Sequence, residues 1–283
     1  KPDRRQRQMC IRDSCFGCGA GGNAISFLLD YEKLNFVEAI EALAAQAGVE
    51  VPREQTSGGD AQQKQRVHQL YEAINFAARF YQTQLRQHPN KTLAVSYLKQ
   101  RGVSGEVARD FGIGYAPAGW DNLLNAAAAA FGDKKEVVLK QLANVGLLVA
   151  KDNGSYYDRF RERVMFPIHD NRGRIIAFGG RVLNDDKPKY LNSPESEVFH
   201  KQRELYGLYE ARKRNRQLDQ IVLVEGYLDV ISLFQFGINY AVATLGTASG
   251  ETHLEKIFRH THKLIVCFDG DDASSFELVL WVC

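Results

Sequence analysis

The chain has 283 residues, of which 45% are hydrophobic and 25% charged, with a formal net charge of +2. These values are ordinary for a soluble protein, and no apolar run approaches the roughly 20 residues of a membrane span. The five cysteines give no disulfide framework. We therefore expect a cytoplasmic protein of two or three domains that does not contact a membrane. We also expect it to be a monomer.

Two cysteines near the start, Cys15 and Cys18, are followed by glycines and form half of a zinc knuckle. Glycines at such a site let backbone amides approach the thiolates. A tetrahedral zinc needs two more ligands, but Cys10 stands alone upstream and the first histidine is His68. The sequence therefore predicts an incomplete zinc site.

Helical spacing of apolar residues predicts two short helices over residues 23–33 and 35–47. Residues 54–66 are polar and contain glycine, so we interpret them as an interdomain linker. A longer amphipathic helix is predicted over 67–85, and another over 92–101. The aromatic stripe on the long helix could stack bases, but core packing needs the same spacing and is the favoured interpretation.

The pattern changes to strands from residue 157. Arg159, Arg161 and Arg163 occupy alternate positions, which predicts that they line one face of a strand. Further on, a turn-forming run at 171–174 separates two apolar runs. This arrangement predicts an antiparallel hairpin.

Charge is distributed unevenly along the second half of the chain. Residues 159–216 contain 14 Lys and Arg against 8 Asp and Glu, whereas residues 217–283 contain 3 against 9. A basic segment leading into an acidic one fits a polyanion that one part holds and presents to metals held by the other. The alternative, that these charges only solvate two surfaces, stays open.

Residues 221–271 alternate between short β-branched runs and segments with helical periodicity. Strands are predicted over 221–224, 240–243 and 264–268, with helices over 227–236 and 250–259. A β-α-β-α-β order implies a parallel sheet with right-handed crossovers.

Acidic residues follow two of these predicted strands: Glu225 after the first, and Asp269 and Asp271 after the third. Reactive groups collect at the carboxyl ends of such strands. Three carboxylates at one edge suit Mg²⁺ or Mn²⁺, and so metal-dependent phosphoryl or nucleotidyl chemistry. Each motif alone is usually only a turn, but both in this order are far more specific.

Taken together, these two acidic motifs resemble the Toprim domain of bacterial DnaG-type primases, topoisomerases and some nucleases. Other segments are similar to DnaG-type primases in particular. They are Cys-Phe-Gly-Cys-Gly-Ala-Gly-Gly at 15–22, Phe-Gly-Ile-Gly-Tyr-Ala-Pro at 111–117 and Pro-Lys-Tyr-Leu-Asn-Ser-Pro-Glu at 188–195. The resemblance covers most of the chain from Leu93 to Asp271.

The resemblance implies an α+β polymerase N-terminal subdomain followed by a truncated α/β Toprim parallel sheet, with a small helical remnant of a zinc-ribbon domain at the N-terminus. The corresponding domains are predicted at 1–53, 67–216 and 217–283. Residues 1–14 do not match the family, and we interpret them as non-native. Residues 272–283 also depart from it, because the family continues with further strands and another acidic pair.

The function implied is synthesis of short RNA primers from ribonucleoside triphosphates on single-stranded DNA. The resemblance implies that Glu225, Asp269 and Asp271 bind Mg²⁺ or Mn²⁺, although Glu225 could instead act as a general base. Zinc would be held by Cys15 and Cys18 only if further ligands exist. The residues implied in phosphate or template binding are Arg101, Arg181, Lys189 and Lys201, with Arg159 and Arg161 as weaker candidates.

The partners implied are the DNA template, the nucleotides and, for the intact protein, a replicative helicase bound through a domain absent from this sequence. Two alternatives remain at this stage. One is another Toprim enzyme, a nuclease or topoisomerase, although nothing in residues 93–207 resembles a topoisomerase's tyrosine nucleophile or strand-passage domains. The other is a non-catalytic fragment that binds single-stranded DNA.

Overall fold

The computed structural model describes residues 13–14, 21–22, 24–31, 36–47, 49, 58–184, 186–246, 250–268 and 278–281. It divides into two compact units, Lys1–Ala61 and Gln62–Cys283. Among the described residues, no helix combines the length and the apolar character that crossing a bilayer needs.

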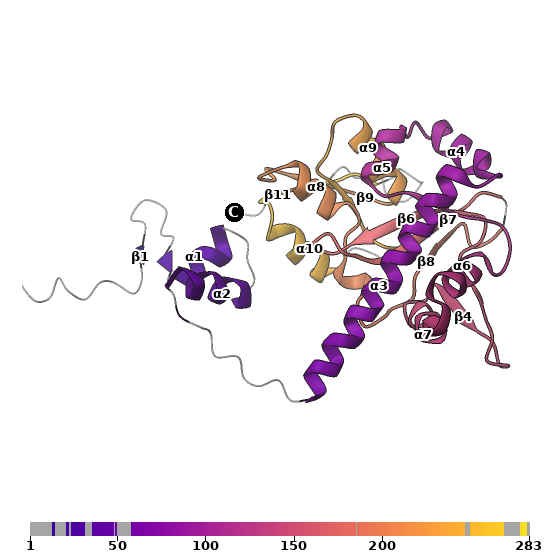
Figure 1. Ribbon diagram of the computed structural model, residues 1–283. Coiled ribbons are helices and arrows are strands. Elements are labelled where there is room, and N and C mark those ends of the chain that lie inside the picture. Colours follow the sequence, from indigo (N-terminus) through magenta and orange to yellow (C-terminus); the bar gives the residue numbers. More distant parts are fainter. Residues whose placement is uncertain are drawn as a thin grey trace, which may run out of the picture. The chain divides into compact units, whose positions relative to one another are not determined.

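The first unit pairs two short antiparallel strands and adds two helices (Figure 1). They are β1 (Asp13–Ser14), β2 (Gly21–Gly22), α1 (Ala24–Tyr31) and α2 (Phe36–Ala47). Both helices confirm the predicted ones, with ends shifted by a few residues. The zinc candidates Cys15 and Cys18 lie outside the described residues.

A long helix, α3 (Gly58–Gln87), leads into the second unit. It begins inside the segment predicted as a linker, at Gly58 rather than at residue 67, so most of that linker is helical. The aromatic stripe of α3 packs into the core: Tyr81 is 2% exposed, and Tyr71, Phe76 and Phe80 are partly buried against the hydrophobic clusters. Core packing of this stripe is therefore confirmed.

The remaining helices and strands of the second unit follow in chain order. They are α4 (Lys91–Gln100), α5 (Gly105–Asp110), β3 (Gly114–Ala116), α6 (Asn122–Phe131), the 3-10 helix η2 (Gly132–Lys134), α7 (Lys135–Asn144), β4 (Leu148–Ala150), β5 (Tyr156–Asp158), β6 (Arg163–His169), β7 (Ile175–Val182), β8 (Tyr190–Asn192), the 3-10 helix η3 (Lys201–Arg203), α8 (Leu208–Arg214), β9 (Ile221–Val224), α9 (Tyr227–Gln235), β10 (Ala241–Ala243), α10 (Glu251–Phe258), β11 (Lys263–Val266) and β12 (Leu278–Trp281).

The first large sheet of this unit is antiparallel, with strand order β3-β6-β7-β8. Its centre is the predicted hairpin, whose turn is closed by Asp170: the carboxylate accepts hydrogen bonds from the backbone N–H groups of Arg172 and Arg174, each 2.9 Å long. Gly173 supplies the left-handed residue of that turn, at φ +77°. The hairpin prediction is confirmed.

The second large sheet has the strand order β10-β9-β11-β12. Strand β9 pairs in parallel with both β10 and β11, which confirms the predicted β-α-β-α-β unit. Strand β12 adds an antiparallel edge to β11, and it lies in the segment that departs from the family pattern.

The two sheets share one hydrophobic core. Phe111 stacks on Tyr206, and Tyr206 in turn contacts the ring of Tyr227, with 4.7 Å between centroids. Each of the three side chains is at most 4% exposed. The boundary predicted at 216/217 stays a prediction, but residues on both sides of it pack into the same compact unit.

Candidate functional site

A pocket of about 430 Å³ is lined by residues of both sheets. We call it the inter-sheet pocket. Its lining residues are Arg101, Arg181, Lys189, Tyr190, Asn192, Glu225, Gly226, Tyr227, Leu228, Asp229, Thr244 and Gly246. Four residues predicted from the sequence, Arg101, Arg181, Lys189 and Glu225, therefore line a single cavity.

The acidic part of the pocket comes from the turn between β9 and α9. Glu225 directly follows the strand and is exposed, and Asp229 lies one helical turn further on. The Oδ2 atom of Asp229 accepts a hydrogen bond from the backbone N–H of Gly226, at 3.0 Å. This bond holds the turn that carries Glu225, as an acid in the first turn of a helix often does.

Asp269 and Asp271 lie outside the described residues, so their position relative to Glu225 stays a prediction. The strand that precedes them is described. It pairs in parallel with β9, with Val266 opposite Leu223. Chain leaving β11 therefore starts from the same sheet edge as Glu225.

The acids of the pocket suit a hard divalent cation. Glu225 and Asp229 both contribute carboxylate oxygens, the donors that Mg²⁺ and Mn²⁺ prefer. Within the described ranges, no group of three or more His, Cys, Asp or Glu is arranged to hold a metal. A complete ligand set would thus need acids beyond these two.

The cationic part of the pocket is built on aromatic rings. The guanidinium of Arg181 lies 4.8 Å from the ring centroid of Tyr190 and 5.8 Å from that of Tyr97. Arg101, at the end of α4, lies 5.5 Å from the Tyr97 ring. Such contacts hold guanidinium groups in place without using their N–H donors.

Arg181 is the most informative of these cations. Its Nε and Nη1 atoms are buried and have no hydrogen-bond partner among the described residues. Buried donors normally have partners, so the pair is a place where an anion from outside the described residues would fit. A guanidinium presents such donors in a fork that fits phosphate oxygens.

The tyrosines of the pocket keep their protons at neutral pH. Burial raises the pKa of Tyr190, the nearby Tyr97 raises it further, and Arg181 opposes the shift. Burial also raises the pKa of Tyr227, although the hydrogen bond to Asn192 lowers it somewhat. Both hydroxyl groups therefore remain hydrogen-bond donors.

Hydrogen bonds and close packing fix the two sheets against each other at the pocket. The hydroxyl of Tyr227 donates to Oδ1 of Asn192 at 2.7 Å, and Nδ2 of Asn192 donates to the carbonyl of Leu245 at 2.9 Å. A Cβ on Gly179 would come within 2.4 Å of the Tyr227 ring. Only a glycine in β7 lets the ring approach this closely.

A buried arginine holds the segment that carries Lys189. Nη1 of Arg163 donates to the carbonyl of Pro188 at 3.0 Å and to that of Gly180 at 3.3 Å. Burial lowers the pKa of this side chain, and the neighbouring Arg161 lowers it further. Arg163 is thus a positioning residue for the basic side of the pocket.

The prediction that Arg159, Arg161 and Arg163 line one face of a strand is wrong. Strand β6 begins only at Arg163. Before it, Glu162 has φ +50°, a left-handed conformation that interrupts the alternation. The carboxylate of Asp158, meanwhile, accepts hydrogen bonds from the backbone N–H groups of Leu123 and Leu124 in the first turn of α6.

Arg161 instead forms a second aromatic site outside the pocket. Its guanidinium lies 3.9 Å from the ring centroid of Trp120 and 5.7 Å from that of Tyr157. Trp120 is 59% exposed, so part of this cluster faces solvent. Arg159 and Lys201 do not line the pocket either, and the backbone N–H of Lys201 donates to Glu195.

Sequence reasoning missed several residues of the pocket, chiefly Tyr190, Asn192, Tyr227 and Asp229, and also Tyr97, whose ring contacts the arginines of the pocket. The signal for Asp229 was its spacing of four from Glu225, which places both on one side of a helix start. The aromatic and amide residues gave no such signal, because their role depends on contacts across the two sheets.

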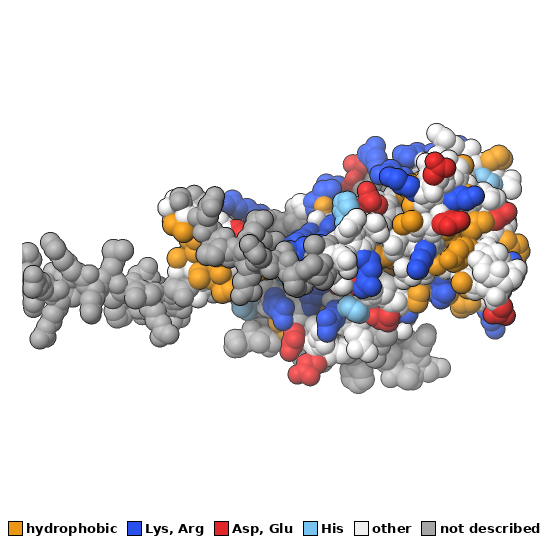
Figure 2. Space-filling model, turned by 60° about the horizontal axis from the view of Figure 1, so that its bottom comes forward, with side chains coloured by type: hydrophobic (Ala, Val, Ile, Leu, Met, Phe, Trp, Pro, Cys, Tyr) orange, Lys and Arg blue, Asp and Glu red, His pale blue; other side chains and the backbone are white. Residues whose placement is uncertain are grey.

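Basic side chains are not confined to the pocket. On the face drawn in Figure 2, Lys and Arg side chains are spread across the surface with Asp and Glu among them. The uneven charge along the sequence therefore does not produce a purely basic surface on this face. It is the pocket that brings specific cations close to specific acids.

Three family models match successive parts of the chain. They are a CHC2 zinc finger over residues 6–59, the N-terminal domain of the DNA primase catalytic core over 80–212, and a Toprim-like domain over 222–274. The DNA primase of Pseudomonas aeruginosa is 58% identical over 261 residues, which make up 92% of this chain and 39% of that protein. The chain thus spans about two fifths of the length of the curated relatives it matches.

Solved structures agree with this match. A DnaG primase catalytic domain bound to single-stranded DNA is 51% identical, with a TM-score of 0.67 over 74% of this chain and 66% of that one. The RNA polymerase domain of Mycobacterium tuberculosis primase DnaG is 34% identical, with a TM-score of 0.65 over 72% of this chain and 67% of that one. The predicted fold class is confirmed, and the chain belongs to the family of bacterial DnaG-type DNA primases.

Proposed function

We propose that this chain carries the polymerase chemistry of a primase: it joins ribonucleotides into short RNA primers on a single-stranded DNA template. One observation carries the proposal. The inter-sheet pocket sets Glu225 and Asp229 beside three cations, and one of these, Arg181, has buried donors without a partner among the described residues. Metal-assisted phosphoryl transfer needs this arrangement, in which carboxylates that can bind a metal lie opposite cations that can bind phosphate.

In the reaction, a 3′-hydroxyl oxygen forms a bond to the α-phosphorus, and the bond from that phosphorus to the bridging oxygen breaks to release pyrophosphate. Glu225 and Asp229, with Asp269 and Asp271, would hold the Mg²⁺ or Mn²⁺. A bound metal lowers the pKa of the hydroxyl and neutralises charge on the phosphate. The hydroxyl proton is transferred either to solvent or to Glu225, and in the second case Glu225 acts as a general base.

The cations of the pocket would hold the triphosphate or the template backbone. Arg181 can donate from Nε and Nη1 to phosphate oxygens, while the rings of Tyr97 and Tyr190 keep its guanidinium in place. Lys189 acts as a mobile point charge, and Arg163 sets the segment on which it lies. Arg101 extends this basic surface toward α4.

A path for the template would continue over the cluster of Trp120, Tyr157 and Arg161. An exposed indole beside a guanidinium can stack a base and pair with its phosphate. The similar catalytic domain bound to single-stranded DNA supports a role of this kind. Arg159 and Lys201 stay candidates for weaker phosphate contacts outside the pocket.

Zinc binding belongs to the first unit. The CHC2 zinc-finger match supports zinc use by this part of the family, and we propose that Cys15 and Cys18 are two of the ligands. For the whole protein, a replicative helicase remains a proposed partner.

The proposal is tested by primer synthesis from labelled ribonucleotides on a single-stranded template, with Mg²⁺, with Mn²⁺ and with neither. The wild-type chain should give metal-dependent product, and Glu225→Gln should lower it at least about 100-fold, because a hundredfold corresponds to about 2.7 kcal/mol of lost transition-state stabilisation. Glu251→Gln is a matched control, since Glu251 is an exposed glutamate in the first turn of α10 that does not line the pocket.

Template binding is measured in parallel by fluorescence anisotropy. Wild-type protein that binds the template but makes no product with either metal would show a binding fragment rather than a polymerase. Degradation of the labelled template instead would indicate the nuclease alternative.

A further inference from the structure

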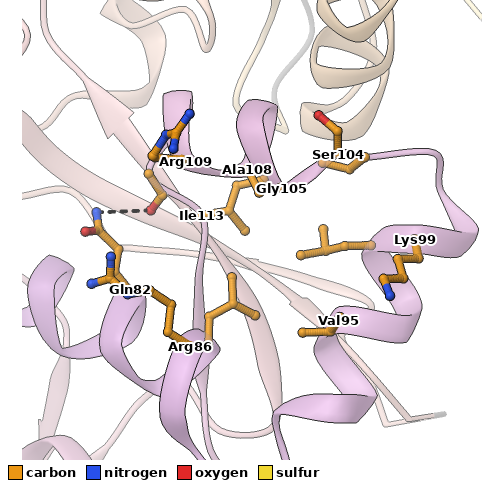
Figure 3. Close-up of a pocket in the computed structure, with 13 residues that line it drawn as sticks. Gln82, Arg86, Val95, Lys99, Ser104, Gly105, Ala108, Arg109 and Ile113 are labelled. Carbon is orange, nitrogen blue, oxygen red and sulfur yellow. Dashed lines mark hydrogen bonds between the residues drawn. The ribbon is translucent and has the colours of Figure 1, made fainter.

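A second pocket, of about 470 Å³, lies among α3, α4 and α5 and shares no lining residue with the inter-sheet pocket (Figure 3). We call it the α3–α5 pocket. Its lining residues are Gln82, Leu85, Arg86, Val95, Leu98, Lys99, Val103, Ser104, Gly105, Ala108, Arg109, Gly112 and Ile113. Its volume lies within the range of about 300–1,000 Å³ that is typical of ligand sites.

The floor of the α3–α5 pocket is aliphatic. Leu98, Val103 and Ile113 are each at most 5% exposed and belong to the main hydrophobic core. Figure 3 shows the side chains of Val95 and Ile113 directed into the space between the helices. No aromatic side chain is among the described residues that line the pocket, so these offer no surface on which nucleic-acid bases stack.

The rim of the pocket is cationic. Arg86, Lys99 and Arg109 lie around the aliphatic floor, one from each helix, and all three are exposed (Figure 3). The described lining residues include no carboxylate. Among the described residues, none of the three cationic side chains has an ion pair or a side-chain hydrogen bond.

Two demands on an occupant follow from this arrangement. The floor favours one or two apolar side chains, because burying them removes apolar surface from water. The rim favours negative charge on either side of that anchor, because complementary charges speed encounter and select the partner. An acidic protein segment with an apolar anchor meets both demands.

We propose that the α3–α5 pocket is a docking site for an acidic segment of a partner protein, which inserts one or two bulky apolar side chains between α3, α4 and α5. The site is separate from the chemistry of the inter-sheet pocket. The docking proposal therefore does not depend on the proposed polymerase function.

The probe is a fluorescein-labelled peptide with two central leucines flanked on each side by three glutamates. Its binding to the whole chain is followed by fluorescence anisotropy at low and at moderate salt. Two comparison peptides separate the two demands: one replaces the leucines with alanines, and one replaces the glutamates with lysines. We expect the leucine–glutamate peptide to bind at least about tenfold more tightly than either, and its affinity to fall as salt rises.

Two variants localise the binding. Gly105→Phe occupies pocket space, and a Cβ at this position meets no atom within 4 Å, so the fold should accept it. The double variant Arg86→Glu with Lys99→Glu reverses charge at two exposed positions. Arg79→Glu is the matched control, an exposed arginine of α3 that does not line the pocket.

We expect each of the two pocket variants to weaken binding of the probe at least about tenfold and Arg79→Glu to change it less than about twofold. Circular dichroism checks that each variant is folded. The proposal is overturned if the wild type does not bind the probe, if Gly105→Phe binds it as well as the wild type does, or if the leucine and alanine peptides bind equally. That last result would mean only general attraction to a basic surface.

Discussion

The two large sheets of the second unit contribute opposite charges to the inter-sheet pocket by different structural means. In the parallel sheet, Glu225 follows directly at the carboxyl end of a strand, where the backbone order alone fixes its place. In the antiparallel sheet, Arg181 lies within β7 and Lys189 in the segment before β8. Their positions depend on aromatic rings and on the buried Arg163.

Substitutions on the two sides of the pocket should therefore have different effects. The acids act through a metal, so losing them should affect chemistry more than binding. The cations act on phosphates, so losing them should affect binding first. Substitutions of residues between the sheets should lower stability. They should affect chemistry and binding only indirectly.

The largest effect is expected from the acidic side. The double variant Glu225→Gln with Asp229→Asn should lower turnover at least about 100-fold, because the charge that holds the divalent ion is lost. Affinity for single-stranded DNA should change less than about threefold, as neither side chain is expected to contact phosphate. Steady-state kinetics and anisotropy on the same preparation check this; an equal fall in both would contradict the division of roles.

The next effect is expected from the cationic side. Arg181→Met removes the guanidinium but keeps much of the stem, and should weaken binding of template or nucleotide about tenfold. It should also reduce the salt dependence of binding if the contact is to template phosphate. Arg181→Lys is the control, because it keeps the positive charge but not the planar guanidinium. The affinity of this variant should lie between that of the unchanged protein and that of Arg181→Met.

A smaller effect is expected between the sheets. Tyr227→Phe removes the hydrogen bond to Asn192 and should lower the free energy of unfolding by about 1 kcal/mol. Denaturant unfolding measures it. Asn192→Ala should cost more, since it also removes the bond to the carbonyl of Leu245. Equal costs for the two variants would show that the second bond is not stabilising.

The smallest effect should have the opposite sign. The hydroxyl of Tyr206 is buried and has no hydrogen-bond partner among the described residues. Burial, together with the charge of Glu210, raises the pKa of this group. Tyr206→Phe keeps the ring contacts and removes an unsatisfied polar group, so stability should be unchanged or higher by up to about 1 kcal/mol. A clear loss of stability in the same unfolding measurement would reveal a role for the hydroxyl.

Part of this site could be predicted from the sequence because the residues that form it lie within short segments of the chain. The β-branched runs, the glycine turns and the acid after the first parallel strand lie within short segments, so the β-α-β-α-β order and the place of Glu225 follow from spacing. Arg181, Lys189 and Arg101 were identified through family resemblance. The structure then places them around one pocket.

Other features could not be predicted, because they depend on contacts between distant segments. The alternation of Arg159, Arg161 and Arg163 predicted a strand, but Asp158 bonds to α6 and Glu162 turns left-handed, so Arg161 reaches Trp120 instead. Local pattern cannot report a hydrogen bond between residues more than thirty positions apart.

Residues close together in the chain were enough to predict the β-α-β-α-β order, the fold family and the place of Glu225 directly after the first parallel strand. Only the tertiary structure decided which cations face those acids, which rings hold Arg181, and that three helices enclose a second, cation-rimmed pocket. The physical reason is that cavities and ring contacts form from side chains that meet only when the sheets and helices pack together.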